Sequence, residues 1–318
     1  MKGLELAWQY YQAYGKEMIE TVGKDAVGRI AVGLVGEGSQ AFGFDDEISQ
    51  DHDFGPGFCI WIQSSDLSQL YEPLQRAYLD LPPVFKGFST ANIIAQDRLG
   101  VKEIGAFYRQ FTGCPGVPET NMDWLLTPET HLAAATNGKI FRDDLGIFTS
   151  IRNKLLAFYP EDVLRKKIAA RAAVMSQAGQ YNLLRVIKRR DSVAAMLAAA
   201  RFCEAAFSMI YLLNRRYMPF YKWSLRGMED LFLLQECTAH LKSLPRIFSL
   251  ISDGQWEDCY ELAYQATESI CAAVATQLNA QGFSTVRSDF LQDHLKSIMD
   301  GISDPQLRSL HFMADCNN

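Results

Sequence analysis

The chain has 318 residues, of which 48% are hydrophobic and 21% are charged, a composition typical of a soluble globular protein with one large or two modest domains. Its net charge of −6 gives no overall positive field for binding nucleic acid, although a local basic stripe stays open. No apolar signal segment follows Met1, and the longest apolar stretch, residues 193–213, contains Arg201 and Glu204. We therefore expect a cytoplasmic protein in which this stretch is a buried helix and not a membrane span.

The cysteines predict reduced thiols. There are seven, an odd number with no C-x-x-C pair, and the five histidines are equally dispersed. Most of the cysteines lie in apolar helical surroundings, which favours a reducing compartment over disulfides and argues against a zinc site. Their positions are Cys59, Cys114, Cys203, Cys237, Cys259, Cys271 and Cys316.

The first half of the chain alternates helical and extended patterns. Residues 5–22 have apolar side chains at helical spacing, and their aromatic residues suit a core or an oligomer interface equally well. Residues 66–80 predict a second helix, with Asp66 as its N-cap. A third helix is expected after Thr127 and Pro128, which have the usual roles of cap and first helical residue. Strands are predicted at residues 30–35, 58–62, 84–85, 101–104 and 139–142.

From Gly146 onward the strand pattern ends and only helical periodicity remains. We therefore predict an α+β chain: an N-terminal domain, residues 1–146, with a mixed β-sheet and flanking helices, and a C-terminal all-helical domain, residues 147–318. The alternative is one continuous body, because the short linker at residues 144–146 gives the halves little freedom to move. Helices are expected at residues 149–157, 160–178, 181–216, 224–242, 255–278 and 287–300, with breaks at Gly179, Pro219, Pro245 and Gly254.

The most informative motif is Gly38-Ser39 followed, after eleven residues, by Asp51 and Asp53. An apolar, glycine-containing run precedes it, and a second apolar run follows. Gly38 allows the backbone to approach a phosphate, and on an extended chain two carboxylates two residues apart point to the same side. Magnesium prefers such oxygen ligands together with substrate phosphates. The spacing therefore favours a magnesium and nucleoside triphosphate site.

A solvated acidic hairpin between two strands is the competing interpretation of the same segment. Residues 45–47 and 51–53 together contain five carboxylates within nine residues. Such a cluster is self-repelling unless a cation or hydrogen-bond donors offset it. This repulsion favours the metal site.

Three motifs resemble the polymerase-β-type nucleotidyltransferase superfamily, and within it a bacterial family catalogued as a domain of unknown function. They are Gly-Glu-Gly-Ser at residues 36–39, the acidic segment at residues 43–49, and Asp-His-Asp-Phe-Gly-Pro at residues 51–56. The resemblance continues at residues 123–125, 138–143, 159–162, 179–182 and 213–223, so it covers most of the chain.

This resemblance implies roles for individual residues. Asp51 and Asp53 would hold two magnesium ions that bridge the triphosphate of the nucleotide, and Gly38 and Ser39 would grip its phosphates. A hydroxyl of the second substrate would then attack the α-phosphorus, with pyrophosphate as the leaving group.

A third carboxylate usually completes such a site, and two candidates stay open. Glu103 follows a predicted strand and is preferred for catalysis, with a surface strand residue as its alternative. Asp143 follows the strand at residues 139–142 and is preferred for orientation, with a turn cap as its alternative.

For several other polar residues, a functional role and a structural role are both open. Asp45, Asp46 and Glu47 either orient the metal site or form a solvated turn, and His52 is expected to be structural. In the helical half, Arg185 and Lys222 are candidates for binding phosphate or substrate, against a solvated helix face as the alternative.

The expected function is therefore magnesium-dependent transfer of a nucleoside monophosphate, with ATP as the preferred donor, to a hydroxyl of a small molecule. The combination of sheet and helical bundle also looks like aminoglycoside- and lincosamide-modifying enzymes, an analogy of fold alone. A protein or a tRNA is an alternative acceptor, although the acidic balance argues against nucleic acid. A non-catalytic nucleotide-binding regulator or antitoxin-like protein is the alternative class, and homo-oligomerisation stays open.

Overall fold

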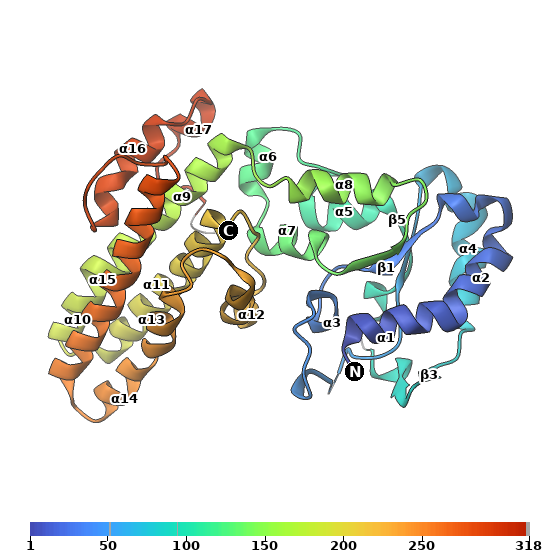
Figure 1. The fold of residues 1–318 in the computed structure, drawn as a ribbon, viewed down its shortest axis with the longest axis horizontal. Helices are drawn as coiled ribbons and strands as arrows, with labels where there is room; N and C mark the ends of the chain where they lie inside the picture. The colour runs from blue at the N-terminus through green and yellow to red at the C-terminus, as the bar shows by residue number, and fades with distance from the viewer. Residues whose placement is uncertain (51, 94, 316–318) are drawn as a thin grey trace. The chain divides into compact units, whose positions relative to one another are not determined.

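A computed structural model describes residues 1–50, 52–93 and 95–315 of the chain (Figure 1). The chain divides into two compact units. The first contains Met1–Glu119 and Thr130–Phe158, and the second contains Thr120–Glu129 and Tyr159–Asn318. All the strands of the described residues lie in the first unit. The predicted combination of an α+β N-terminal part with a helical C-terminal region is confirmed.

The first unit is built from short strands and the helices that cover them. Its strands are β1 (Ala31–Leu34), β2 (Cys59–Ile62), β3 (Val84–Phe85), β4 (Phe88–Ser89), β5 (Gly100–Glu103) and β6 (Lys139–Arg142). Its helices are α1 (Gly3–Tyr10), α2 (Lys16–Gly23), α3 (Ser39–Phe42), α4 (Leu67–Leu79), α5 (Ile104–Thr112), most of α7 (Glu129–Thr136) and α8 (Ile147–Leu156). The predicted strands are therefore confirmed to within one or two residues.

Four strands form a mixed sheet in the order β5-β2-β1-β6. Strand β1 is antiparallel to β2 and β6, whereas β5 is parallel to β2. The end of β1 at Leu34 therefore meets the beginnings of the other three strands, at Cys59, Gly100 and Lys139. We call this side of the sheet the loop edge.

Strand β2 is buried along its whole length, and its alternating side chains pack on opposite faces of the sheet. Ile60 and Ile62 belong to a core cluster with residues of the N-terminal helices and α4. Trp61 stacks on Phe148 of α8, with 4.0 Å between ring centroids. Helices therefore cover both faces, and α8 is part of the core of the first unit (Figure 1).

The predicted N-terminal helix is interrupted by a π-helical turn, Tyr11–Gly15, between α1 and α2. A Cβ atom on Gly15 would lie 2.4 Å from the ring of Phe58, so the glycine makes room for that ring. Tyr10 and Tyr11 are buried in the core cluster, which assigns both aromatic residues to the core and not to an interface.

The second unit is a set of helices of very different lengths. They are α6 (Asn121–Leu126), α9 (Glu161–Met175), α10 (Leu184–Lys188), α11 (Ser192–Leu213), α12 (Tyr221–Gly227), α13 (Cys237–Ser243), α14 (Arg246–Ser252), α15 (Trp256–Ala280), α16 (Leu295–Asp300) and α17 (Pro305–Ser309). A core cluster joins α10, α11, α14 and α15.

The helix break predicted at Gly179 is wrong. The chain stays helical from α9 through the π-helical segment Ser176–Leu183 into α10, and Gly179 lies inside that segment. A Cβ atom at this position would be 2.2 Å from the ring of Phe202 on α11. The glycine therefore serves close packing between helices and not termination.

Helix α11 is the one helix, among those described, that is long and apolar enough to cross a membrane by length and composition. Core helices of soluble proteins meet the same criterion. Its buried residues include Phe202, Met209 and Leu212, and Arg171 of α9 donates a hydrogen bond to its Ser208 at 2.6 Å. These contacts agree with the predicted role as a buried helix.

The division into units differs from the predicted boundary between residues 146 and 147. Residues 147–158 belong to the first unit, and residues 120–129 belong to the second. Side-chain contacts explain both shifts. Phe148 packs on the sheet through Trp61, and Glu129 forms an ion pair with Arg171 of α9 at 2.9 Å.

Candidate functional site

The predicted phosphate-binding turn lies at the loop edge, directly after β1. Gly36 and Gly38 have φ angles of 131° and 100°, a region that residues with a Cβ atom rarely adopt. Ser39 then begins the short helix α3. The glycines are thus required by the backbone itself.

Asn137 holds this turn from the other side of the loop edge. Its side chain accepts a hydrogen bond from the Gly36 N–H at 2.9 Å and donates one to the Gly36 carbonyl at 2.6 Å. Arg152 of α8 donates to the Asn137 carbonyl at 3.2 Å. The conformation of the turn is therefore fixed by residues about a hundred positions later in the chain.

Asp53 is brought next to the turn by a single guanidinium group. Arg98 pairs with the Asp53 carboxylate at 3.3 Å and with the carboxylate of Glu37, inside the turn, at 3.4 Å. The same guanidinium lies 3.9 Å from the position of a Cβ atom built on Gly38. The glycine turn, Arg98 and Asp53 thus form one polar site.

The backbone on either side of Arg98 is tied to β2. The Cys59 thiol donates to the Arg98 carbonyl at 3.2 Å, and the Gly100 N–H donates to the Phe58 carbonyl at 3.1 Å. Burial raises the pKa of the Cys59 thiol to about 11, so this thiol stays protonated at neutral pH and is no nucleophile.

The extended conformation expected for the acidic pair is wrong at Asp53. Its φ angle is 52°, and β2 begins only at Cys59. The backbone of Gly55 passes so close to the β3–β4 hairpin that an added Cβ atom would lie 2.6 Å from the Ser89 carbonyl oxygen. The chain therefore makes a tight loop here instead of a strand. Asp51, the other predicted ligand, lies outside the described residues.

The Asp53 carboxylate alone is only partly suited to bind magnesium. Its Oδ1 atom accepts a hydrogen bond from the Ala95 N–H at 2.9 Å, and its Oδ2 atom faces Arg98. Within the described part of the chain, no three histidine, cysteine or acidic side chains are grouped to hold a metal ion. A metal bound by Asp53 would compete with Arg98 for the carboxylate.

The acidic residues before the pair have separate structural roles. Asp45 is 1% exposed, and its Oδ2 atom accepts a hydrogen bond from the Gly3 N–H at the start of α1. Asp46 forms a turn with Ser49, whose N–H donates to the Asp46 carboxylate at 3.0 Å. Asp45 therefore anchors the N-terminal helix beside the site, and Asp46 has the turn role considered above.

Glu103 and Asp143 lie at the opposite edge of the sheet from the glycine turn. Glu103 is the last residue of β5 and pairs with Ile62, whereas the loop edge of the same strands is at Gly100 and Cys59. With a rise of about 3.3 Å per residue, the two ends of β5 are about 10 Å apart. Asp143 follows β6, which runs away from the loop edge. The expectation that either residue completes the site is therefore not met by their position.

Both carboxylates cap helices instead. Glu103 is the N-cap of α5 and accepts hydrogen bonds from the N–H groups of Gly105 at 2.8 Å and Ala106 at 2.6 Å. Asp143 accepts one from the Thr149 N–H in the first turn of α8 at 2.7 Å. An N-cap such as Glu103 contributes about 1 kcal/mol to stability.

Arg185 and Lys222 belong to the second unit, and both are exposed. The Arg185 guanidinium lies 3.6 Å from the centre of the Tyr181 ring, and the Lys222 ammonium lies 5.3 Å from that of Trp223. Each cation thus rests on an aromatic ring close to it in sequence. Their predicted contact with phosphate stays a prediction.

Sequence reasoning missed Arg98 and Asn137. Neither belongs to a local motif. Arg98 meets Asp53 across 45 positions of sequence, and Asn137 meets Gly36 across 101. Glu37 was visible within the Gly-Glu-Gly-Ser motif, but its pairing with Arg98 required the fold.

Comparison with known proteins connects part of the chain to a family. A model of the family described as Domain of unknown function (DUF4037) matches residues 124–224, about a third of the chain. No curated protein and no solved structure matches. The matched range includes β6, α8 and the helices from α9 to α11, whereas the glycine turn and Asp53 precede it.

Proposed function

We propose that this chain is a magnesium-dependent nucleotidyltransferase, which transfers a nucleoside monophosphate from a nucleoside triphosphate, with ATP as the expected donor, to a hydroxyl of a small molecule. One observation carries the proposal: the Arg98 guanidinium pairs with Glu37 inside the glycine turn and with Asp53. The glycine turn that we propose to bind phosphate, a cation, and the carboxylate that we propose to bind the metal are therefore neighbours.

The local structure supports this assignment. In the turn that follows β1, Gly38 has no Cβ atom, which suits close approach of phosphate oxygens to the backbone, whereas the Gly36 N–H is already bound by Asn137. Arg98 adds a charge-assisted donor. The mixed sheet agrees with the nucleotidyltransferase-type fold that the motifs at residues 36–56 resemble. Bound magnesium would neutralise charge on the phosphates as pyrophosphate leaves.

Nucleotide binding tests the proposal directly. We expect ATP with magnesium to raise the melting temperature of the wild type by several degrees when ATP is in large excess over its dissociation constant. The Asp53→Asn variant is expected to lose this rise. Asp46→Asn is a matched control, because Asp46 belongs to a turn in the same acidic segment and an asparagine keeps an acceptor for Ser49. No rise in the wild type with any of the four ribonucleoside triphosphates would contradict the assignment.

Catalysis requires a second measurement. We expect pyrophosphate to be released when ATP, magnesium and a pool of small hydroxyl compounds are mixed with the wild type, and not with Asp53→Asn. A protein or tRNA pool replaces the small molecules in parallel reactions, with RNA as the least expected acceptor because the chain has a net charge of −6.

A non-catalytic nucleotide-binding regulator is the second candidate. The position of Glu103 and Asp143 favours it, because both carboxylates cap helices at the edge of the sheet away from the glycine turn. Such a protein would show the magnesium-dependent rise in melting temperature without pyrophosphate release in any pool.

The six cysteines described are free thiols, as we expect for the proposed cytoplasmic setting.

A further inference from the structure

Three cations of α9 are buried together in the second unit. Lys166 is 0% exposed, Lys167 is 1% exposed and Arg171 is 7% exposed. Burying a cation is costly unless acceptors surround it. Among the described residues, the carboxylates that form ion pairs with these cations are those of Glu129 and Asp315.

Most of the acceptors come from the segment at residues 311–315. The Lys166 ammonium donates to the carbonyl oxygens of His311 at 2.7 Å, Phe312 at 3.0 Å and Ala314 at 3.2 Å. Lys167 pairs with the Asp315 carboxylate at 2.9 Å. Arg171 reaches the same carboxylate at 3.3 Å and the Asp315 carbonyl at 3.2 Å. The donors thus enclose a group of oxygen atoms, as they would enclose a bound anion.

The segment itself is held by polar contacts and not by a regular element or a core. Residues 312–315 form turns, and Phe312 and Met313 are only partly buried. Asp315 has a φ angle of 99°, which is unfavourable for a residue with a Cβ atom. Its side chain is nevertheless 0% exposed. The carboxylate therefore reaches the cations at the expense of backbone strain.

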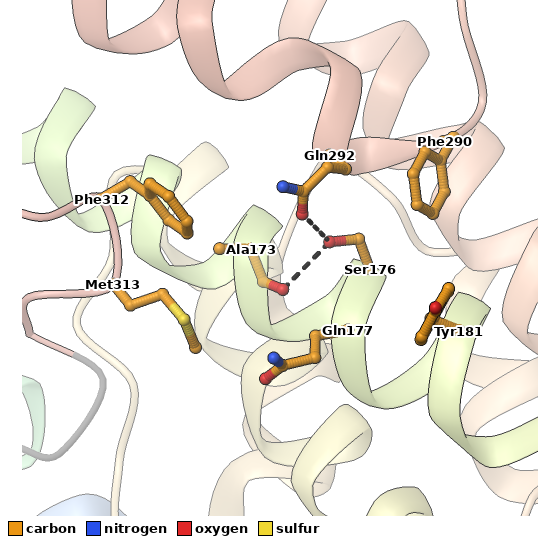
Figure 2. Close-up of a pocket in the computed structure, with 8 residues that line it drawn as sticks. All are labelled: Ala173, Ser176, Gln177, Tyr181, Phe290, Gln292, Phe312 and Met313. Atoms are coloured by element: carbon orange, nitrogen blue, oxygen red, sulfur yellow. Dashed lines mark hydrogen bonds between the residues drawn. The ribbon is translucent and has the colours of Figure 1, made fainter.

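A pocket of about 360 Å³ adjoins the segment, since Phe312 and Met313 line it (Figure 2). Phe312 and Met313 form one side of it, and Tyr181 and Phe290 lie opposite (Figure 2). Ser176, Gln177 and Gln292 add polar groups between them. The volume is at the lower end of the range for small-molecule sites, about 300–1,000 Å³. Phe312 connects the two features, since its side chain lines the pocket and its carbonyl binds Lys166.

We propose that Lys166, Lys167 and Arg171 form a binding site for a phosphate monoester with a flat apolar body, and that residues 311–315 occupy this site in the structure. When the segment leaves, its oxygen atoms vacate the cations, and the place of the Phe312 side chain, which lines the pocket, is free for the body of the ligand. The three cations with Glu129 then have a net charge of +2. A phosphate monoester, with a charge of about −1.5 to −2 at pH 7, matches this better than a carboxylate does. The inference is independent of the nucleotide site.

Phenyl phosphate is a suitable probe, and the full-length Asp315→Asn variant is the test. The amide weakens the hold of the segment on the cations, so we expect the dissociation constant of phenyl phosphate, measured by calorimetry, to fall by about tenfold relative to the wild type. The probe should also restore the lowered melting temperature of the variant. Asp300→Asn is the matched control, because Asp300 pairs with Lys296 on the surface of α16. Inorganic phosphate and benzoate are expected to bind more weakly.

A second measurement uses the wild type alone, so it holds even where the variant fails to fold. Phenyl phosphate should accelerate removal of residues up to 311 by a carboxypeptidase, followed by mass spectrometry. An unchanged digestion rate at millimolar probe, or equal affinity of Asp315→Asn and Asp300→Asn for phenyl phosphate, would overturn the proposal. The segment would then be a structural clamp only.

Discussion

At the scale of single residues, Arg98 is the cation that joins the two carboxylates of the candidate nucleotide site. Its guanidinium lies between two carboxylates, those of Glu37 and Asp53, which are 51% and 22% exposed. Ion pairs with this much exposure contribute only about 0.2–1 kcal/mol. Such a cation can exchange carboxylates for phosphate oxygens at little cost. Under the proposed function, Arg98 would be the counterion of Asp53 until a metal and a triphosphate replace it.

Removing Arg98 should separate these two roles. In the Arg98→Ala variant without nucleotide, we expect Mn²⁺ to bind about two- to fivefold more tightly than in the wild type, because Asp53 has lost a competing cation. ATP with magnesium should bind about tenfold more weakly, because one charge-assisted hydrogen bond to phosphate is lost. Calorimetric titration measures both constants.

Arg109→Ala is the control for this pair of titrations, since Arg109 is an exposed cation of α5 in the same unit. It should change neither constant. Weaker Mn²⁺ binding in Arg98→Ala would contradict the competition between Arg98 and the metal for Asp53.

At the scale of elements, the segment from α9 to α10 shows how a tertiary contact overrides a local signal. Glycine inside a helical pattern usually suggests an end, yet Gly179 continues the helix through a π-helical segment. The reason is Phe202 of α11, which occupies the space that a side chain at residue 179 would need. Nothing within the local sequence of residues 176–183 identifies that partner.

This packing makes Gly179→Ala a sharp test. The added Cβ atom would be 2.2 Å from the Phe202 ring, so the ring or the helix must move, and we expect a loss of about 1–3 kcal/mol in the free energy of unfolding. Gly28→Ala is the control, because nothing lies within 4 Å of a Cβ atom there, and it should change stability by less than about 1 kcal/mol. Urea unfolding measures both.

The double variant Gly179→Ala/Phe202→Leu tests the physical reason itself. The smaller side chain removes the ring that clashes with the new Cβ atom. The double variant should therefore lose less free energy of unfolding than the two single variants lose in sum. Fully additive losses would mean that the cost of Gly179→Ala arises elsewhere.

The elements of the site were predictable to different degrees. The strand before Gly36 and the turn at Gly38-Ser39 follow from an apolar run that ends in glycines, and both occur as predicted. The position of Glu103 was not predictable from its strand alone. Whether the end of β5 meets the glycine turn depends on β5 running parallel to β2, and hence on the strand order. A local pattern carries no information about that order.

At the scale of the whole molecule, composition and periodicity gave the succession of a mixed sheet and a helical region, but not the boundary between the units. Residues 147–158 carry helical periodicity like the region after them, so the sequence groups them with it. Contacts with Trp61 place them with the sheet. Helical periodicity shows that one face is buried and leaves open what buries it.

Buried acids throughout the molecule predict a loss of stability in alkali. Burial raises the pKa of Cys59 to about 11 and that of Cys237 to about 12, from an ordinary value of 9.0. It also raises the pKa of Tyr10 to about 12 from 10.0. Each group keeps its proton longer in the folded state than in the unfolded state. Its contribution to the free energy of unfolding is therefore complete below about pH 9 and is lost as the pH rises towards 11 and 12.

Urea unfolding under reducing conditions at pH 8 and pH 10 measures this loss. By pH 10 each of the two cysteines should lower the free energy of unfolding by about 1 kcal/mol, because the unfolded thiol ionises while the buried thiol does not. The Cys59→Ala/Cys237→Ala variant should be less stable at pH 8, since both side chains are 0% exposed and leave space behind. The free energy of unfolding of this variant should nevertheless fall less between the two pH values than that of the wild type, by about 2 kcal/mol. The same fall in both proteins would contradict burial of these thiols as the cause, and would assign the alkaline loss to other groups such as Tyr10.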